Sequence, residues 1–340
     1  MAKSALVLGG TRFVGLHSVR YLIEMGYRVT VLNRGSHPEV LPPGVERITC
    51  DRKDPVRVRQ ALAEAVSGTS FDLVVDPSAY VPEDLEPVVD ALLGHVGSYV
   101  FISSGSVYKS VNLYPWHEGI PQVEDDSQGA YGWGKKRCED LLLSAHAKHG
   151  FPCVNIRPGY IFGPHNTVYR EAYFFDRILD KRPILVPGTG VVLSQFGHVD
   201  DLANLIVLAG EAPSASGQAY NFAGQTMRPL DDYVKACAAA VSAAMGKEYK
   251  ADIVHYWPAE VSLTDADTGR LFPYRWRVNT VRDISKARYE LGYEERITLD
   301  DGLIECAQWY FGEIAAGRRP FPTPDYTEED AILSRLAARS

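Results

Sequence analysis

The stretch LVLGGTRFVG, Leu6 to Gly15, decides how the rest of the chain is interpreted. A short apolar run, 5–8, leads into the glycines, and a segment with helical spacing, 16–25, follows them. Gly9 permits a tight turn, and Gly15 lets the helix approach the strand closely because it has no side chain. The stretch therefore predicts a strand, a glycine turn and a helix at the start of the chain.

The turn resembles a dinucleotide-binding loop of the form G-x-x-G-x-x-G, with Arg12 in the middle glycine place. The amides and the positive dipole end of the following helix suit a pyrophosphate. We therefore expect the loop to hold a dinucleotide, the alternative being a tight turn that binds nothing. The loop residues expected to contact the cofactor are Gly9, Thr11, Arg12, Phe13, Val14 and Gly15.

The second expected strand, 28–32, runs into Asn33 and Arg34, and neither residue is acidic. An acid at this point would bind the ribose 2′-hydroxyl and favour NAD. Arg34 can instead pair with a 2′-phosphate or stack on adenine, and Arg12 can lie at the same end of the cofactor. The pair favours NADP over NAD, with a surface salt bridge as the alternative role of each arginine.

Further cofactor contacts are expected after the third and fourth strands, at Asp51, Arg52, Pro77 and Ser78. Asp51 is placed to meet the adenine amino group. Its alternative role is to cap the helix expected from Asp54.

Strand-like and helix-like segments alternate through the first half of the chain. The strands are expected at 5–8, 28–32, 47–50, 73–75, 99–102 and 154–156, and the helices at 16–25, 56–66, from 82 onward and at 138–149. This rhythm predicts an α/β fold, a Rossmann-type doubly wound parallel sheet with a smaller C-terminal substrate-binding domain. Ligands then bind at the carboxyl ends of the strands.

The expected domains are interleaved. Residues 1–165 and about 196–225 form the dinucleotide-binding domain. Residues about 166–195 and 226–320 form the substrate-binding domain, because prolines, aromatic residues and clustered charge replace the earlier rhythm there. Residues 321–340 are expected to be a peripheral tail that ends in a short helix.

Composition, net charge and cysteine spacing exclude some classes of function. The chain has 340 residues, 46% of them hydrophobic, and a net charge of -8, which argues against a strongly basic nucleic-acid surface. Five cysteines without a C-x-x-C pair indicate reduced thiols. The sequence lacks a long apolar run and begins directly with a strand, so we expect a cytoplasmic protein with no signal peptide and no membrane span.

Two further stretches carry chemistry, YVFISSGSVY from Tyr99 and AYGWGKKRCE from Ala130. Tyr131 and Lys135 form a Y-x-x-x-K pair, which places the phenol and the ammonium on one face of a helix. A nearby cation lowers the pKa of a tyrosine. Ser104, at the end of a strand, is the hydroxyl expected to bond the reacting oxygen.

These motifs together resemble the short-chain dehydrogenase/reductase superfamily, in its extended NAD-dependent epimerase/dehydratase branch. The resemblance runs from Ala5 to about Phe311, and its marks are the glycine loop, SSGSVY, YGWGK with Glu139, RPGYIFGP, GHVDDLA, YNFAG and DISKARYELGY. It implies that Tyr131 is the general acid/base, that Lys135 orients the ribose and lowers the pKa of the tyrosine, and that Ser104 polarises the substrate C–O bond. It also implies that Pro158, Tyr160 and Ile161 border the nicotinamide.

Within this branch, GGTRFVG and the stretch 173–190 are similar to the plant chloroplast stem-loop-binding proteins and their bacterial relatives. This likeness keeps a second function open, RNA binding or RNA processing. A cofactor-binding regulatory protein with a vestigial site is a third. By the same resemblance, the helix that carries Tyr131 suggests a homodimer.

The resemblance implies hydride transfer at a secondary alcohol or ketone of a sugar or nucleotide sugar, by an epimerase or oxidoreductase. Dehydratases of the branch carry Asp-Glu after the hydroxyl residue, where this chain has Gly105 and Ser106. Tyr160 and Ser194 also depart from the nucleotide-sugar pattern, which puts a nucleotide diphosphate group in doubt. An NADPH-dependent reductase of a non-sugar ketone is therefore kept as an alternative.

The residues expected to contact the substrate are Tyr80, Ser104, Ser106, Tyr160 and Arg275. Trp116 and His117 are further candidates for the wall of the site, with packing as the alternative. Arg275 and Arg277 either supply cations for a phosphate or belong to a charged face over core aromatic residues. The histidines and cysteines show no ligand spacing, so no metal site is expected.

Overall fold

The structure is a computed structural model that describes residues 2–37 and 40–338. The chain folds into two compact units. The first consists of the chain up to Ile161 with Val199–Ala223 and Arg282–Arg296, and the second of Phe162–His198, Gly224–Val281 and the chain from Ile297 onward. None of the helices among the described residues is long and apolar enough to cross a membrane.

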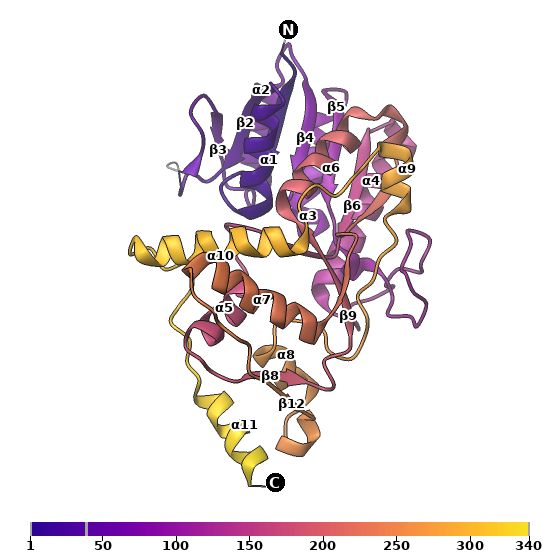
Figure 1. Cartoon of the computed structure of the whole chain (residues 1–340). Coiled ribbons are helices and arrows are strands. Elements are labelled where there is room, and N and C mark those ends of the chain that lie inside the picture. Colours follow the sequence, from indigo (N-terminus) through magenta and orange to yellow (C-terminus); the bar gives the residue numbers. More distant parts are fainter. Residues whose placement is uncertain (1, 38–39, 339–340) are drawn as a thin grey trace. The chain divides into compact units, whose positions relative to one another are not determined.

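A seven-stranded sheet of order β10-β6-β5-β4-β1-β2-β3 forms the centre of the first unit (Figure 1). All its neighbouring strands pair in parallel. The strands are β1 (Ser4–Leu8), β2 (Arg28–Asn33), β3 (Glu46–Thr49), β4 (Phe71–Asp76), β5 (Val96–Ile102), β6 (Cys153–Pro158) and β10 (Ala219–Phe222). The predicted doubly wound parallel sheet is thereby confirmed.

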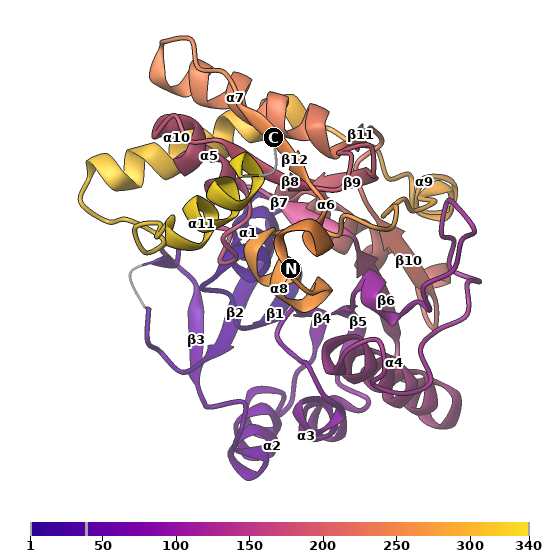
Figure 2. The same ribbon diagram turned by 90° about the horizontal axis from the view of Figure 1, so that it is seen from below.

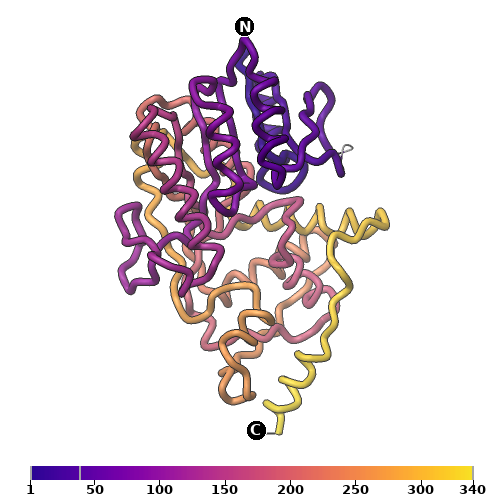
Figure 3. The backbone as a smooth tube through the Cα atoms, turned by 180° about the vertical axis from the view of Figure 1, so that it is seen from behind, coloured from indigo at the N-terminus to yellow at the C-terminus, as the bar shows by residue number. Residues whose placement is uncertain are grey.

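Strand β1 shows why helices cover both faces of this sheet. Ala5 and Val7 join one apolar core, and Leu6 and Leu8 join the other, because successive side chains of a strand point to opposite faces. Helices α1 (Phe13–Glu24), α6 (Val199–Glu211) and α9 (Ser285–Leu291) supply the first core, and α2 (Pro55–Ala65), α3 (Pro82–Leu92) and α4 (Ala130–His149) the second. Figures 2 and 3 show α2, α3 and α4 side by side.

Helix α4 begins at Ala130, well before the expected start at residue 138. Glycines in YGWGK weaken the sequence signal for a helix, since glycine is a poor helix former. Packing against the rest of the unit compensates, and both Gly132 and Gly134 are buried. The earlier start places Tyr131 and Lys135 on the same helix.

The second unit contains a two-stranded sheet, β12-β8, and a three-stranded sheet, β11-β9-β7. Its strands are β7 (Tyr160–Phe162), which begins at the unit boundary, β8 (Ile184–Pro187), β9 (Leu193–His198), β11 (Met227–Pro229) and β12 (Ile253–Tyr256). Its helices are α5 (Glu171–Leu179), α7 (Leu230–Met245), α8 (Asp265–Leu271), α10 (Leu299–Ala315) and α11 (Thr327–Ala337). Phe174, Phe196, Tyr233 and Tyr274 stack in its core.

The unit boundaries differ from the expected ones in two places. Residues 282–296 belong to the first unit, since Ala287, Leu291 and Tyr293 are buried in its core. The segment 321–340, expected to be a peripheral tail, includes α11, whose Ile332 is buried in an apolar cluster of the second unit.

Candidate active site

The glycine loop joins β1 to α1 with two residues in the left-handed region, Gly9 at φ 121° and Gly10 at φ 87°. A Cβ at Gly15 would lie 2.8 Å from the Gly10 nitrogen, so the first turn of α1 packs directly on the loop backbone. Sequence reasoning missed Gly10, where a Cβ would lie 2.7 Å from the Val31 side chain. The adjacent pair of glycines in the sequence was the available signal.

Arg12 is the residue that precedes α1, with extended backbone and an exposed side chain. Its Nη2 lies 3.5 Å from Nε2 of His37. Thr11, Phe13 and Val14 are half-buried beside it. The structure thus retains the open N-terminus of α1 that a pyrophosphate requires.

Asn33, at the end of β2, fastens the loop. Its Nδ2 donates to the Gly9 carbonyl over 2.9 Å, and its Oδ1 accepts from the Gly35 amide over 2.9 Å. Arg34 is exposed. The ends of β1 and β2 are therefore held together where the ribose of a dinucleotide is expected.

Asp51 is exposed and its side chain accepts from the Lys53 amide over 3.0 Å. The cap of α2 is Asp54, which accepts from the Arg57 amide. The alternative of a cap at Asp51 itself is therefore wrong.

The structure corrects the expected role of Arg52. Its guanidinium donates to both carboxylate oxygens of Asp76, over 2.6 and 2.5 Å, and to the Ser78 hydroxyl. Nε and Nη2 also donate to the Asp84 carbonyl. All five N–H groups of the guanidinium are thus used within the protein. None remains for a cofactor.

Pro77 and Ser78, which follow β4, border the glycine loop. The Ser78 hydroxyl donates to the Leu8 carbonyl over 2.7 Å, and a Cβ at Gly15 would lie 3.5 Å from Pro77. Both residues therefore lie against the glycine loop and the first turn of α1.

Lys135 is the most unusual group of the site, a lysine only 2% exposed. Its Nζ donates to the carbonyls of Ala79, over 2.6 Å, and Ile102, over 2.7 Å. The same atom lies 4.9 Å from the ring centre of Tyr80 and 4.6 Å from that of Phe101. Burial lowers the pKa of Lys135 to about 8.

Tyr131 lies one turn before Lys135 on α4 and is half exposed. Its ring centre is 6.0 Å from that of Tyr80, so Tyr80 adjoins both members of the pair. A buried cation beside an accessible phenol suits proton transfer to and from a bound alcohol or ketone.

Two glycines bring α4 to the other segments of the site. A Cβ at Gly132 would overlap the Ser106 carbonyl oxygen, and one at Gly134 would overlap the Tyr80 carbonyl oxygen. Ser104 follows β5 and caps the short helix η2 (Gly105–Val107), accepting from the Ser106 amide over 3.1 Å. The serine segment (residues 103–106), Tyr80 and α4 therefore lie next to one another.

The comparisons with known proteins are consistent with this geometry. The model of the NAD dependent epimerase/dehydratase family matches residues 5–223, which span the glycine loop, the serine segment and the Tyr131–Lys135 helix. The chain belongs to the NAD dependent epimerase/dehydratase family. It is thus a member of a family of NAD-dependent enzymes.

Two curated relatives illustrate the range of this family. The chain is 34% identical to the chloroplast stem-loop binding protein of 41 kDa b of Arabidopsis thaliana, over 98% of this chain and 85% of that protein. It is 26% identical to a dTDP-glucose 4,6-dehydratase of Streptomyces niveus, over 94% of this chain and 96% of the relative.

Solved structures confirm the fold. An epimerase from Methanothermobacter thermautotrophicus matches with a TM-score of 0.74 and 20% identity, over 93% of this chain and 94% of its own. A UDP-glucose 4-epimerase from Thermotoga maritima matches with a TM-score of 0.73 and 20% identity, over 92% and 99% of the two chains.

A buried ion pair anchors the family motif residue Glu139. Its two carboxylate oxygens accept from Arg157 of β6 over 3.0 and 2.6 Å, and Arg157 also donates to the Tyr108 hydroxyl over 3.1 Å. The pair fixes α4 against β6, the strand that ends at Pro158.

Arg282 is a residue that sequence reasoning did not single out. It is 8% exposed, and its guanidinium occupies the space that Cβ atoms would take at Gly105 and Gly159. These glycines directly follow Ser104 and Pro158. The Arg282 side chain therefore lies between the two turns that carry these expected site residues. Beyond Gly159, Tyr160 and Ile161 are half-buried in β7.

The expected substrate residues have different surroundings. Tyr80 is 53% exposed, whereas Trp116 is buried and donates to the Val111 carbonyl, so Trp116 is a packing residue. His117 is exposed and accepts from the Gly119 amide. Ser106 is half-buried.

In the second unit, the RLFPYRWR stretch buries its aromatic rings and exposes Arg275 and Arg277. Arg277 pairs with Asp265 over 2.7 Å and lies over the Trp276 ring. This is the arrangement of a charged face over core aromatic residues.

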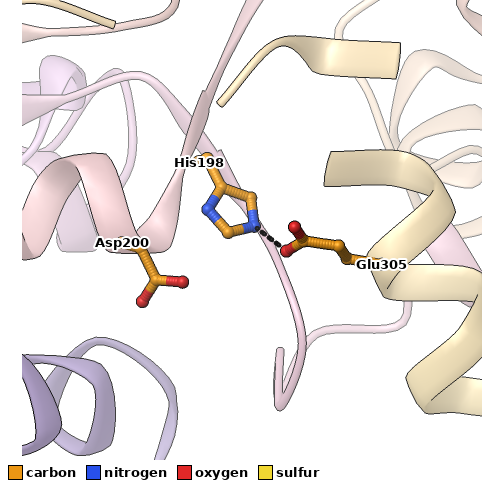
Figure 4. A group of neighbouring side chains, drawn as sticks. All are labelled: His198, Asp200 and Glu305. Carbon is orange, nitrogen blue, oxygen red and sulfur yellow. Dashed lines mark ion pairs between the residues drawn. The ribbon is translucent and has the colours of Figure 1, made fainter. Parts of the chain in front are cut away.

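His198, the last residue of β9, forms an ion pair with Glu305 over 3.5 Å (Figure 4). Asp200, also labelled in Figure 4, belongs to the first unit, where it bonds to His17 over 2.5 Å. Helix α6 begins directly after His198, with Asp200 and Asp201 in its first turn.

Proposed function

We propose that this chain transfers hydride between a nicotinamide dinucleotide and a secondary alcohol or ketone of a sugar or nucleotide sugar, as an epimerase or oxidoreductase. The observation that carries the proposal is the Lys135 ammonium, buried and held by two carbonyls beside Tyr131. A structural lysine would more simply reach solvent, since burying an ammonium is costly.

The glycine loop and the first turn of α1 would hold the pyrophosphate, and Pro77, Ser78 and Pro158 would border the rest of the cofactor. When bound, the cofactor accepts or returns the hydride. Tyr131 removes the hydroxyl proton of the alcohol as the hydride leaves carbon, and it returns the proton in the reverse direction. Lys135 stabilises the phenolate of Tyr131, and Ser104 donates a hydrogen bond to the reacting oxygen of the substrate.

The choice between epimerase and dehydratase rests on the residues after Ser104. Gly105 and Ser106 stand where the dehydratase branch carries acid groups, so Tyr131 is the acid/base of the proposed reaction and water is not eliminated.

The test is turnover of a panel of nucleotide sugars and simple keto sugars, with NAD(H) and NADP(H), followed by product analysis by NMR. We expect one substrate to be oxidised, reduced or epimerised, and Tyr131→Phe to lower its rate by about 100-fold or more with cofactor binding retained. A dehydrated product would overturn the epimerase or oxidoreductase assignment, and full activity in Tyr131→Phe would overturn the mechanism.

A second candidate function is RNA binding, which the name of the Arabidopsis relative favours. The net charge of -8 opposes it. RNA affinity that falls steeply with salt, in a chain that binds no dinucleotide, would support this second function.

A further inference from the structure

Asp76 is a fully buried carboxylate at the end of β4, directly beneath the Lys135 site. It accepts from both terminal nitrogens of Arg52 and, over 2.6 Å, from the Tyr99 hydroxyl. It also accepts from the amides of Ser78 and Ala79, over 3.0 and 3.2 Å. Two strands, a turn and the segment before α2 thus converge on one side chain.

Both carbonyls that hold the Lys135 ammonium are tied to this carboxylate. Ala79 donates its own amide to Asp76 and accepts from Lys135 through its carbonyl. Ile102 lies on β5, the strand that Tyr99 fastens to Asp76. The position of the ammonium is therefore set by two routes that start at Asp76.

We propose that Asp76 is a positioning residue that holds Lys135 and keeps it charged for the reaction. The inference rests on the proposed function, since only hydride transfer gives Lys135 a catalytic task. Asp76 acts through Lys135 and lies too deep to touch a substrate.

The charges around Lys135 show how Asp76 acts. Burial is the main reason that the pKa of Lys135 is lowered to about 8; the Asp76 carboxylate favours the ammonium, and the Arg52 guanidinium opposes it. On α4 itself, the Glu139 carboxylate favours the ammonium, and burial raises the pKa of the neighbouring Cys138 thiol to about 12, which keeps that thiol neutral. The other neighbouring groups are the phenols of Tyr80 and Tyr131, and Arg157, which pairs with Glu139.

The Asp76 carboxylate is itself ionised. Burial alone would raise its pKa, but Arg52, followed by the bonds from Tyr99 and Ser78, holds the pKa of Asp76 below its usual value. The ammonium of Lys135 is accordingly present below about pH 8 and is lost as the pH rises through that value. Removing the Asp76 charge moves this loss to lower pH.

The test is an NMR titration of isotope-labelled lysine ε-carbons in the full chain, with the Lys135 signal identified by its absence in Lys135→Met. We expect Asp76→Asn to lower the pKa of Lys135 by about one unit. Tyr99→Phe removes one bond to the carboxylate but leaves its charge, so the pKa should stay at its wild-type value.

The double variant Arg52→Met/Asp76→Asn removes the buried Arg52–Asp76 pair as a whole and repeats the test if Asp76→Asn alone does not fold. Because Asp76 acts on Lys135 more strongly than Arg52 does, this variant should also lower the pKa of Lys135 relative to the wild type. An unchanged Lys135 titration in both comparisons would overturn the inference. Titration with NADH in the same samples distinguishes the positioning role of Asp76 from the proposed function. A chain that shows the Asp76 effect but binds no dinucleotide supports the positioning of Lys135 and contradicts the proposed function.

Discussion

At the scale of single residues, the structure gives Lys135 an environment that a helix motif alone does not specify. Spacing predicts that Tyr131 and Lys135 share a helix face. The ammonium, however, is held by the carbonyls of Ala79 and Ile102, which belong to other elements. A backbone carbonyl has no sequence signature, so these partners were not predictable without the fold.

Tyr80 adds a ring contact to the same ammonium, and its removal tests this contact. Tyr80→Leu should lower the rate of hydride transfer by about two- to thirtyfold, because a cation–π contact contributes about 0.5–2 kcal/mol. Tyr80→Phe keeps the ring and should keep most of the rate. Steady-state kinetics with the substrate found by the panel measure both rates. An equal loss of rate in both variants would show that the Tyr80 hydroxyl is responsible and not the ring.

Arg34 is the residue at which the cofactor preference can be tested. Arg34→Ala should weaken NADPH binding by about tenfold and leave NADH binding nearly unchanged, because only NADPH carries the 2′-phosphate that a guanidinium pairs with. Fluorescence titrations with both cofactors measure this. Equal losses for the two cofactors would indicate that Arg34 stacks on adenine instead.

At the scale of elements, the position of α4 depends on two glycines. Neither Gly132 nor Gly134 can carry a side chain without displacing the backbone carbonyl of Ser106 or Tyr80. The stretch YGWGK shows the Y-x-x-x-K motif of Tyr131 and Lys135. The helical pattern itself was recognised only from residue 138, because glycine weakens it. Periodicity thus predicted the strands and helices of the sheet well, and it failed where close packing overrides propensity.

Gly134→Ala should therefore displace α4 from the serine segment and Tyr80. We expect a loss of about 1–3 kcal/mol in the free energy of unfolding, as for other overpacked sites, together with most of the activity. Urea unfolding measures the first quantity. The matched control is Gly312→Ala on α10, where a Cβ meets nothing within 4 Å and stability should rise slightly. Wild-type stability and activity in Gly134→Ala would contradict this account of α4.

At the scale of the whole molecule, the chain divides into two interleaved units. The sequence indicates a peripheral tail over 321–340 that ends in a short helix, but it does not indicate how that helix, α11, is held. Its Glu329 is buried against Arg177 of α5, and this pairing of distant residues has no local signal.

Adjacent glutamates on α11 provide a matched test of that pairing. Glu329→Gln should lower the free energy of unfolding by about 3 kcal/mol, because it leaves the buried Arg177 charge without its partner. Glu328 pairs with Arg270 at the surface, and Glu328→Gln should change stability by less than about 1 kcal/mol. Denaturant unfolding of the two variants gives the comparison, and equal losses would show that α11 is not anchored by Glu329.

The central claim is that the chain is a nicotinamide-dinucleotide enzyme, and equilibrium binding of NADH and NADPH to the purified chain tests it most directly. We predict saturable binding of at least one cofactor, and marked weakening in a folded Gly15→Val variant, since a side chain there meets the Gly10 backbone at 2.8 Å. Failure of the folded wild-type chain to bind either cofactor would contradict the claim.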